Sequence, residues 1–119
     1  MPVPRAYLIR YGRPGFVGRF RGDLALSRGD RVVVRGPRGV EFGDVLVEPP
    51  GDDATGDGEV LRAAAPGDES EASRLDARGA ELLAAASARG GELGLPLAFV
   101  DVEVTLDGVA ILHALPWDG

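Results

Sequence analysis

The sequence predicts an α+β protein in which an antiparallel sheet precedes one long helix and a β-hairpin. Short segments rich in Val, Phe, Tyr and Leu, separated by Gly and Pro, fill residues 1–48. Apolar residues then recur at helical spacing over residues 69–89. An Asp-Gly pair at 107–108 separates two apolar segments, which is the strongest short-range signal for a hairpin. Because 119 residues suffice for one ordinary domain, we expect a single domain over 1–119.

Residues 1–48 predict four short strands that form a meander or a small barrel-like sheet. The strands are expected at Ala6–Tyr11, Phe16–Arg21, Arg31–Arg35 and Val40–Glu48. Gly or Pro occupies every gap between them and supplies the backbone angles that a chain reversal needs. Gly39 and Gly43 flank a point where we expect the chain to turn or bulge. Both are therefore predicted to be backbone requirements rather than contact residues.

Residues 49–58 predict a solvated acidic loop, since they contain Pro, Gly, Asp, Thr and one Ala but no large apolar residue. The first, third, fifth and sixth positions of a calcium-loop pattern are present as Asp53, Thr55, Asp57 and Gly58. The twelfth position, where a bidentate Glu completes the ligand shell, is Ala64. An acidic loop without calcium is therefore the favoured interpretation.

A helix is predicted from about Glu69 to Arg89. Asp68 and Glu71 form a possible capping pair at its start. The positions that recur at helical spacing are Ala72, Leu75, Gly79, Leu82, Leu83 and Ala86. The glycines at 90, 91 and 94, with the proline at 96, are expected to end the helix.

A hairpin is predicted from two strands, Leu97–Leu106 and Val109–Leu115. If Leu106 pairs with Val109, one face carries Val100, Val102, Val104, Ile111, His113 and Leu115. The other face then carries Phe99, Asp101, Glu103, Thr105, Ala110 and Leu112. We expect the aliphatic face to cover the helix, so that residues 59–119 form a helix packed on a hairpin.

The residue types exclude several classes of chemistry. The chain has no cysteine, which excludes disulfides and thiolate ligands for zinc or iron-sulfur clusters. His113, the only histidine, is expected on the apolar face without an acid or serine beside it. Asp101 and Glu103 are expected to form a solvated strand face. No catalytic residue, cofactor, metal or small-molecule substrate is predicted, and the protein is not expected to be an enzyme.

The charges are distributed unevenly along the chain. Residues 1–45 contain nine arginines and four acidic residues, whereas residues 46–119 contain four arginines and fifteen acidic residues. A basic surface for RNA is one interpretation. The other is a composition bias, since every basic residue is Arg. The candidate phosphate contacts are Arg13, Arg19, Arg21, Arg35 and Arg38.

The chain begins without the apolar stretch of a signal peptide and has no run of about 20 apolar residues. We therefore expect a cytoplasmic protein with no membrane partner.

Three stretches of the chain resemble the PSP-one C-terminal domain, named for a polymerase suppressor and found in bacterial YaaT (RicT) proteins. They are VVVRGPRGVEFGDVLV (32–47), EVLRAAAPGD (59–68) and GLPLAFVDVEVTLDGVAILHAL (94–115). With residues 18–21, the resemblance covers nearly the whole chain. It marks as structural motif positions Gly39, Glu41, Gly43, Arg62, Asp68, Gly94, Leu95, Asp101, Glu103 and Asp107.

The resemblance implies a non-catalytic adaptor or regulatory subunit in cytoplasmic RNA processing or turnover. Its partners would be YlbF/YmcA-like or RNase Y-like proteins. Two alternatives remain: direct RNA binding by the Arg-rich half, and a truncated fragment without present function. The cysteine-rich segment of YaaT proteins is absent, so no cluster is inferred. The family continues past the hairpin with a helix and a strand, so we expect an open sheet face or edge here.

Overall fold

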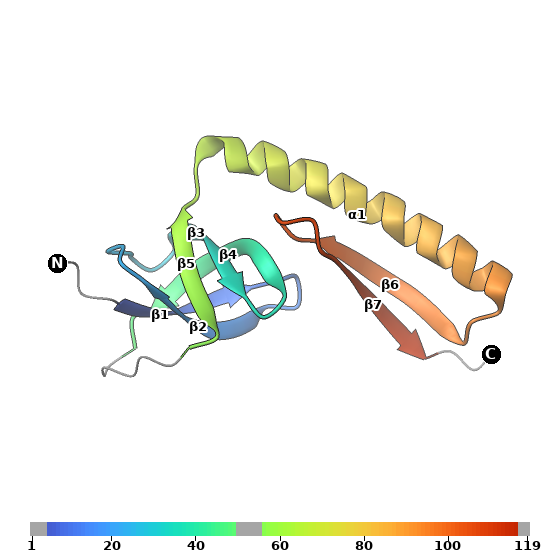
Figure 1. Cartoon of the computed structure of the whole chain (residues 1–119), viewed down its shortest axis with the longest axis horizontal. Coiled ribbons are helices and arrows are strands. Elements are labelled where there is room, and N and C mark those ends of the chain that lie inside the picture. Colours follow the sequence, from blue (N-terminus) through green and yellow to red (C-terminus); the bar gives the residue numbers. More distant parts are fainter. Residues whose placement is uncertain (1–4, 50–55, 117–119) are drawn as a thin grey trace. The chain divides into compact units, whose positions relative to one another are not determined.

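The computed structural model describes residues 5–49 and 56–116 and confirms the α+β class (Figure 1). The elements are β1 (Arg5–Tyr11), β2 (Phe16–Gly22), β3 (Arg31–Gly36), β4 (Gly39–Val47), β5 (Gly58–Ala63), α1 (Pro66–Leu93), β6 (Leu97–Val104) and β7 (Ala110–Pro116). The chain divides into two compact units, unit 1 (Met1–Pro66) and unit 2 (Gly67–Gly119). The residues for which we expected a single domain are therefore divided between two units.

Unit 1 is a closed barrel with the strand order β1-β2-β5-β3-β4, in which β4 pairs again with β1. The four strands expected from the sequence are present to within one residue at each end. The fifth strand, β5, was not predicted. It lies parallel to β2 and antiparallel to β3, so these two strands are neighbours of β5 rather than of each other. The sheet therefore closes as a barrel, in agreement with the barrel-like alternative expected from residues 1–48.

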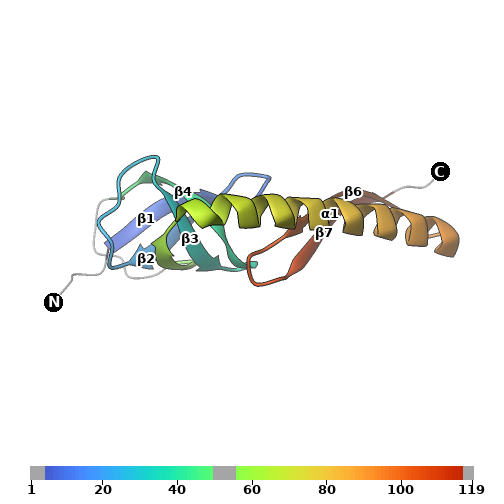
Figure 2. The same cartoon turned by 90° about the horizontal axis from the view of Figure 1, so that it is seen from above.

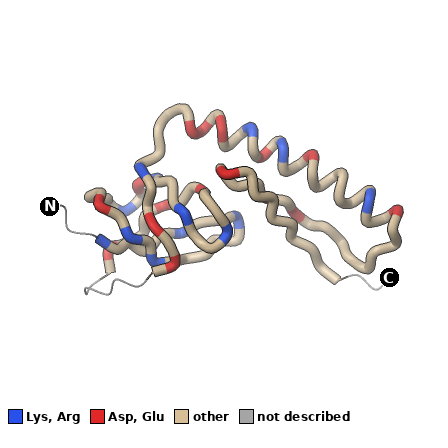
Figure 3. Tube along the Cα trace, in the orientation of Figure 1, with Lys and Arg blue, Asp and Glu red and all other residues tan. Residues whose placement is uncertain are grey.

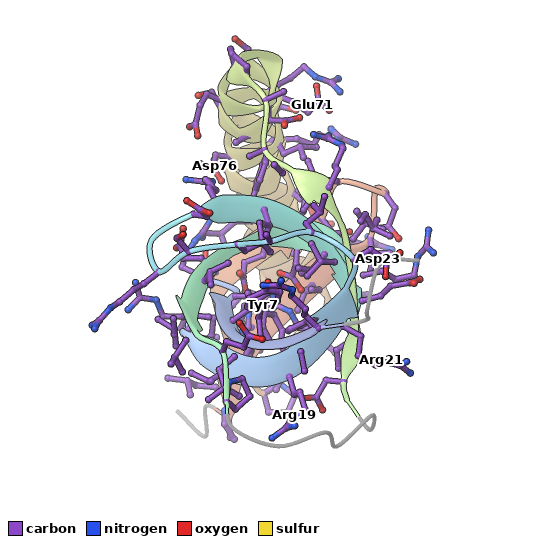
Figure 4. The ribbon with its side chains drawn as sticks, turned by 90° about the vertical axis from the view of Figure 1, so that its left-hand side faces the viewer. Tyr7, Arg19, Arg21, Asp23, Glu71 and Asp76 are labelled. Carbon is purple, nitrogen blue, oxygen red and sulfur yellow. The ribbon has the colours of Figure 1, made fainter. Side chains whose placement is uncertain are left out.

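The barrel interior is filled by alternating side chains from all five strands. The buried cluster consists of Tyr7, Ile9, Tyr11, Phe20, Val32, Val34, Val45 and Val60. The hydroxyl of Tyr7 donates a hydrogen bond to the Leu24 carbonyl (2.7 Å) and accepts one from the Leu26 N–H (3.0 Å). Figure 4 shows Tyr7 inside the ring of strands. This side chain thus ties the segment after β2 to the core.

Of the two glycines singled out in β4, Gly39 is required by the backbone as predicted, whereas Gly43 is required by a packing contact and not by a turn or bulge. Gly39 has a φ of +129°, a conformation that residues with a side chain rarely adopt. Gly43 has no room for a side chain, because an added Cβ would overlap the Cγ2 methyl of Ile9 in the core. The first glycine is required by the backbone angle and the second by close packing.

The helix α1 is longer than expected at both ends. Pro66 occupies its first position, where the missing N–H of proline costs nothing. Asp68 therefore lies in the first turn, which favours acidic residues, rather than before the helix. Gly90 and its neighbour at 91 do not end α1. The helix ends at Leu93 and is followed by Gly94, with φ +66°, and the Leu95 N–H donates to the Gly90 carbonyl at 3.0 Å.

Within unit 2, α1 lies along β6 of the two-stranded sheet (Figures 1 and 2). Contact occurs at two helical glycines. A Cβ added to Gly79 would lie 2.6 Å from the Val102 carbonyl oxygen and 3.9 Å from Val104 Cγ2. A Cβ added to Gly90 would lie 3.1 Å from the Phe99 ring. The prediction that Val102 and Val104 face the helix is therefore confirmed.

No helix in the described part of the chain is long and apolar enough to cross a membrane.

The register of the hairpin differs from the expected one by one residue. Thr105 N–H donates to the Val109 carbonyl (2.9 Å), and Gly108 has a φ of +83°, so the loop contains three residues rather than two. The Thr105 hydroxyl stabilises this loop by donating to Asp107 Oδ1 (2.6 Å) and accepting from the Val109 N–H (3.0 Å). Val102 consequently pairs with Leu112 instead of His113.

This register corrects the predicted faces of β7. Ile111, His113 and Leu115 lie on the face that carries Asp101 and Glu103, away from α1. The opposite face, toward α1, carries Phe99, Val102, Val104, Ala110, Leu112 and Ala114. A register irregularity between residues 99 and 101 leaves Val100 without a direct partner on β7 and 51% exposed.

Candidate functional site

Three side chains with metal-binding donor atoms lie together on the outer face of the hairpin. Asp101 and His113 are direct cross-strand partners, and Glu103 lies two residues farther along β6. His113 Nε2 is 2.5 Å from Glu103 Oε2. One donor atom from each of the three residues lies within 4.8 Å of the others, and the described residues contain no other group of this kind. We call these three residues the hairpin cluster.

The hairpin cluster is partly shielded from water. The Glu103 side chain is 10% exposed and the His113 side chain 29% exposed, and Asp101 is half-buried. Such shielding strengthens the attraction between a carboxylate and a cation, because the local dielectric is lower than in water. The surroundings of the cluster therefore favour a bound positive charge.

The sequence placed the two acids on one face correctly and placed His113 on the wrong face. The expected solvated face is wrong for Glu103, which is 8% exposed, and His113 has this acid beside it. The error in the face of His113 arose from assuming a two-residue turn at Asp107-Gly108. A signal for the longer turn was present, because Thr105 directly precedes a three-residue hairpin loop and Gly108 occupies its left-handed position. Shifting the register by one residue moves every side chain of β7 to the other face.

The arginines considered for RNA binding have different surroundings. Arg21 and Arg35 both lie opposite Glu59 of β5, one on each side of that strand. Both line a groove of about 660 Å³ that also contains Asp23, Asp57 and Glu59. Arg35 Nη1 lies 3.2 Å from Glu59 Oε1. The structure thus brings two of the five candidates together, in a groove of mixed charge.

Arg38 has a structural partner. Its guanidinium donates to both carboxylate oxygens of Glu41, at 2.7 and 3.2 Å, and the two side chains are only 14% and 10% exposed. It also lies 5.3 Å from the centre of the Phe16 ring. A phosphate would have to displace Glu41 to gain the same two hydrogen bonds. This pair explains why Glu41 is buried in the turn region between β3 and β4.

The remaining two candidates are Arg13, in the exposed turn after β1, and Arg19, on β2. The backbone N–H of Arg19 donates to Asp57 Oδ2 at 2.9 Å. Figure 4 shows the side chains of Arg19 and Arg21 outside the barrel. All five candidates belong to unit 1, as expected.

The net charge of each part of the chain depends on where the chain is divided. Unit 1 contains ten arginines and nine acidic residues, and unit 2 contains three arginines and ten acidic residues. Figure 3 shows acidic positions between the arginines on the strands of unit 1. The barrel is therefore close to neutral overall, because acidic residues of the loop and of β5 belong to it.

The other motif positions have local structural roles. Arg62 Nη1 donates to the Ala63 carbonyl at 3.3 Å. Gly94 and Leu95 form the end of α1, and Asp107 holds the hairpin loop. The contacts of Gly94, Leu95 and Asp107 maintain the helix end and the hairpin loop.

The calcium pattern cannot be followed along its whole length. Asp53 and Thr55 lie outside the described residues. Asp57 Oδ2 accepts the Arg19 N–H, and Gly58 begins β5. Ala64, at the position that needs a bidentate carboxylate, donates its N–H to the Arg31 carbonyl at 2.9 Å. The last part of the pattern is therefore part of the barrel.

Unit 2 exposes many large apolar side chains. Among the described residues, seven of the twelve exposed large hydrophobics belong to it: Leu93, Leu95, Leu97, Val100, Val109, Leu112 and Leu115. They lie on the hairpin or at and just after the end of α1. In comparisons with known proteins, no family model, curated protein or solved structure matches the chain.

Proposed function

We propose that this protein is a non-catalytic adaptor or regulatory subunit that binds a protein partner through unit 2. The observation that supports this proposal is the apolar surface of the hairpin. Leu112, on the face toward α1, is 48% exposed, and Leu115, on the opposite face, is 59% exposed. Val100 of β6 is 51% exposed. Apolar surface of this extent on a small unit is typical of an interaction site.

The architecture of unit 2 supports the same function. Its sheet contains only two strands, and a sheet of this size is marginal in stability unless other elements cover it. Each strand has one outer edge without a neighbouring strand among the described residues. Such an edge can accept a strand from another protein, whose alternating side chains would then lie beside Leu112 on one face and Leu115 on the other.

The biological setting follows from the resemblance to the PSP-one C-terminal domain. On that basis the partner belongs to a cytoplasmic RNA processing or turnover complex, with YlbF/YmcA-like or RNase Y-like proteins as the first candidates. The hairpin surface would supply the contact, and unit 1 would remain available for RNA or for a second protein.

The test is affinity capture from the cell extract of the source, with and without nuclease, followed by identification of the bound proteins. The full chain is compared with the double variant Leu112→Ser/Leu115→Ser. The matched control is Val17→Ser/Val47→Ser in the barrel, where the two side chains are 56% and 51% exposed. Nuclease-resistant partners should be lost with the hairpin variant and kept with the control. Equal capture by both variants would contradict the proposal.

Direct RNA binding is the second candidate, because Arg21 and Arg35 line one groove. Filter binding at several salt concentrations tests it with Arg21→Ala/Arg35→Ala. The control is Arg78→Ala/Arg89→Ala on α1, which removes two exposed arginines from unit 2. Arg21→Ala/Arg35→Ala should weaken binding to all RNA sequences equally. It should also make the affinity less dependent on salt concentration, by the amount that the loss of up to about two phosphate contacts produces. Absence of binding by the wild type at low salt would end this hypothesis.

A further inference from the structure

We propose that the hairpin cluster, Asp101, Glu103 and His113, binds a divalent transition-metal ion, with Zn²⁺ as the expected ion. The three donors come from adjacent strands and lie within 4.8 Å of one another. This inference is independent of the proposed adaptor function, since the apolar surface could bind a partner with or without a metal.

The backbone holds the three donors in place. Asp101 and His113 face each other across the ladder, and Glu103 follows Asp101 on the same face. The Thr105 loop sets this register, which continues without a shift from Val104 to Asp101 and so places Asp101 opposite His113. Two of the ligands thus have fixed positions in a hydrogen-bonded pair of strands, which reduces the conformational entropy that metal binding would otherwise cost.

The distances suit a small divalent ion. Bonds of about 2.0–2.2 Å from Zn²⁺ to nitrogen and oxygen ligands separate neighbouring donors by about 3.0–3.5 Å. The His113 and Glu103 donors are 2.5 Å apart, so they would have to separate by roughly 1 Å to bind one ion. Side-chain rotation can supply this movement without a change in the strands.

The donor types select the class of metal. Imidazole nitrogen favours zinc and other first-row transition metals, whereas Mg²⁺ and Ca²⁺ prefer sites built from oxygen alone. Two carboxylates together balance the charge of a divalent ion. The low exposure of Glu103 strengthens its attraction to the ion. Three protein ligands also leave a coordination position for water or for a group from a partner.

The composition of the chain makes the experiment specific. The sequence has one histidine and no cysteine, so any metal bound through an imidazole is bound through His113. Isothermal titration calorimetry of the full chain without an affinity tag, at neutral pH, should show one Zn²⁺ per chain and much weaker binding of Mg²⁺ and Ca²⁺. In nuclear magnetic resonance spectra, the ring nitrogens of His113 should shift when Zn²⁺ is added.

Three variants and one control complete the test. Asp101→Asn, Glu103→Gln and His113→Gln should each weaken Zn²⁺ binding by at least about tenfold. Glu92→Gln, which removes a carboxylate that is 65% exposed on α1, should bind as the wild type does. Circular dichroism without metal checks that each variant is folded.

The decisive readouts do not require every variant to fold. The ring-nitrogen shift is measured on the wild type and needs no variant. Of the two acids, Asp101 is less buried than Glu103, so Asp101→Asn is the variant that should disturb the fold less. An unchanged His113 spectrum with excess Zn²⁺ would overturn the proposal. So would equal Zn²⁺ affinity of the wild type and Asp101→Asn, because the hairpin cluster would then not be the binding site.

Discussion

Replacing Tyr7 by Phe should destabilise the barrel although it removes a single oxygen atom. The hydroxyl makes two hydrogen bonds to the backbone, at 2.7 Å to the Leu24 carbonyl and 3.0 Å from the Leu26 N–H. At about 0.5–1.5 kcal/mol for each bond, the expected loss is about 1–3 kcal/mol. Leu24 is 39% exposed, so water can partly replace the lost donor. We therefore expect about 1.5 kcal/mol.

The same change at Tyr11 is the matched control. Tyr11 lies on the same strand and is 9% exposed, and no hydrogen bond of its hydroxyl is found among the described residues. Tyr11→Phe should therefore change the free energy of unfolding by less than about 0.5 kcal/mol at neutral pH. The two tyrosines are the only ones in the chain, so the comparison covers every tyrosine hydroxyl.

Native-state hydrogen exchange of the amides in β1, β3 and β4 measures the stability of unit 1 separately from that of unit 2. A loss of about 1.5 kcal/mol corresponds to a fall of about 6–12 °C in the unfolding midpoint of a domain of this size. If Tyr7→Phe and Tyr11→Phe had equal effects, the hydroxyl of Tyr7 would not hold the Leu24–Leu26 segment as described.

Three further predictions concern packing and pH. Val102→Asp should destabilise unit 2 by several kcal/mol, because it buries an unpaired charge at a position that is 2% exposed. Val100→Asp, at 51% exposure, should have little effect, and equal shifts in the denaturation midpoint would show that the faces are assigned wrongly. Gly43→Ala should cost about 1–3 kcal/mol, because its Cβ overlaps Ile9 in the core, and a neutral result in denaturant titration would contradict this. Burial, assisted by nearby carboxylates, raises the pKa of Tyr11 above its usual value. The folded state therefore favours the neutral phenol. The stabilisation that Tyr11 contributes through this shift is complete below about pH 10 and is lost as the pH rises through the pKa of Tyr11 in the folded state. Tyr11→Phe should reduce the alkaline loss of stability in a pH series of unfolding midpoints, and an unchanged series would refute the assignment.

Local patterns predicted the four strands β1 to β4 because each is bounded by its own turn residues and either alternates across the barrel wall or, in β3, contains an apolar run. They did not predict β5, since Val60 is its only buried residue and Leu61 is 39% exposed. β5 lies between β2 and β3, which do not pair with each other, so the sheet closes only when β5 pairs with both. Gly90 likewise has a low helix propensity, yet α1 continues through it to pack on Phe99.

For the candidate site, the sequence by itself placed Asp101 and Glu103 on one strand face, because a strand repeats every two residues. The position of His113 depended on how one strand pairs with the other. A loop longer by one residue reverses the face of every side chain on β7, and hydrogen bonds of Thr105 select that loop. The ion pair between Arg38 and Glu41 also required the folded turn, since both side chains are shielded only there. Composition, period and turn residues thus determined most elements of this protein but not β5. Strand pairing decided which side chains meet, because pairing is set by contacts between residues distant in the chain.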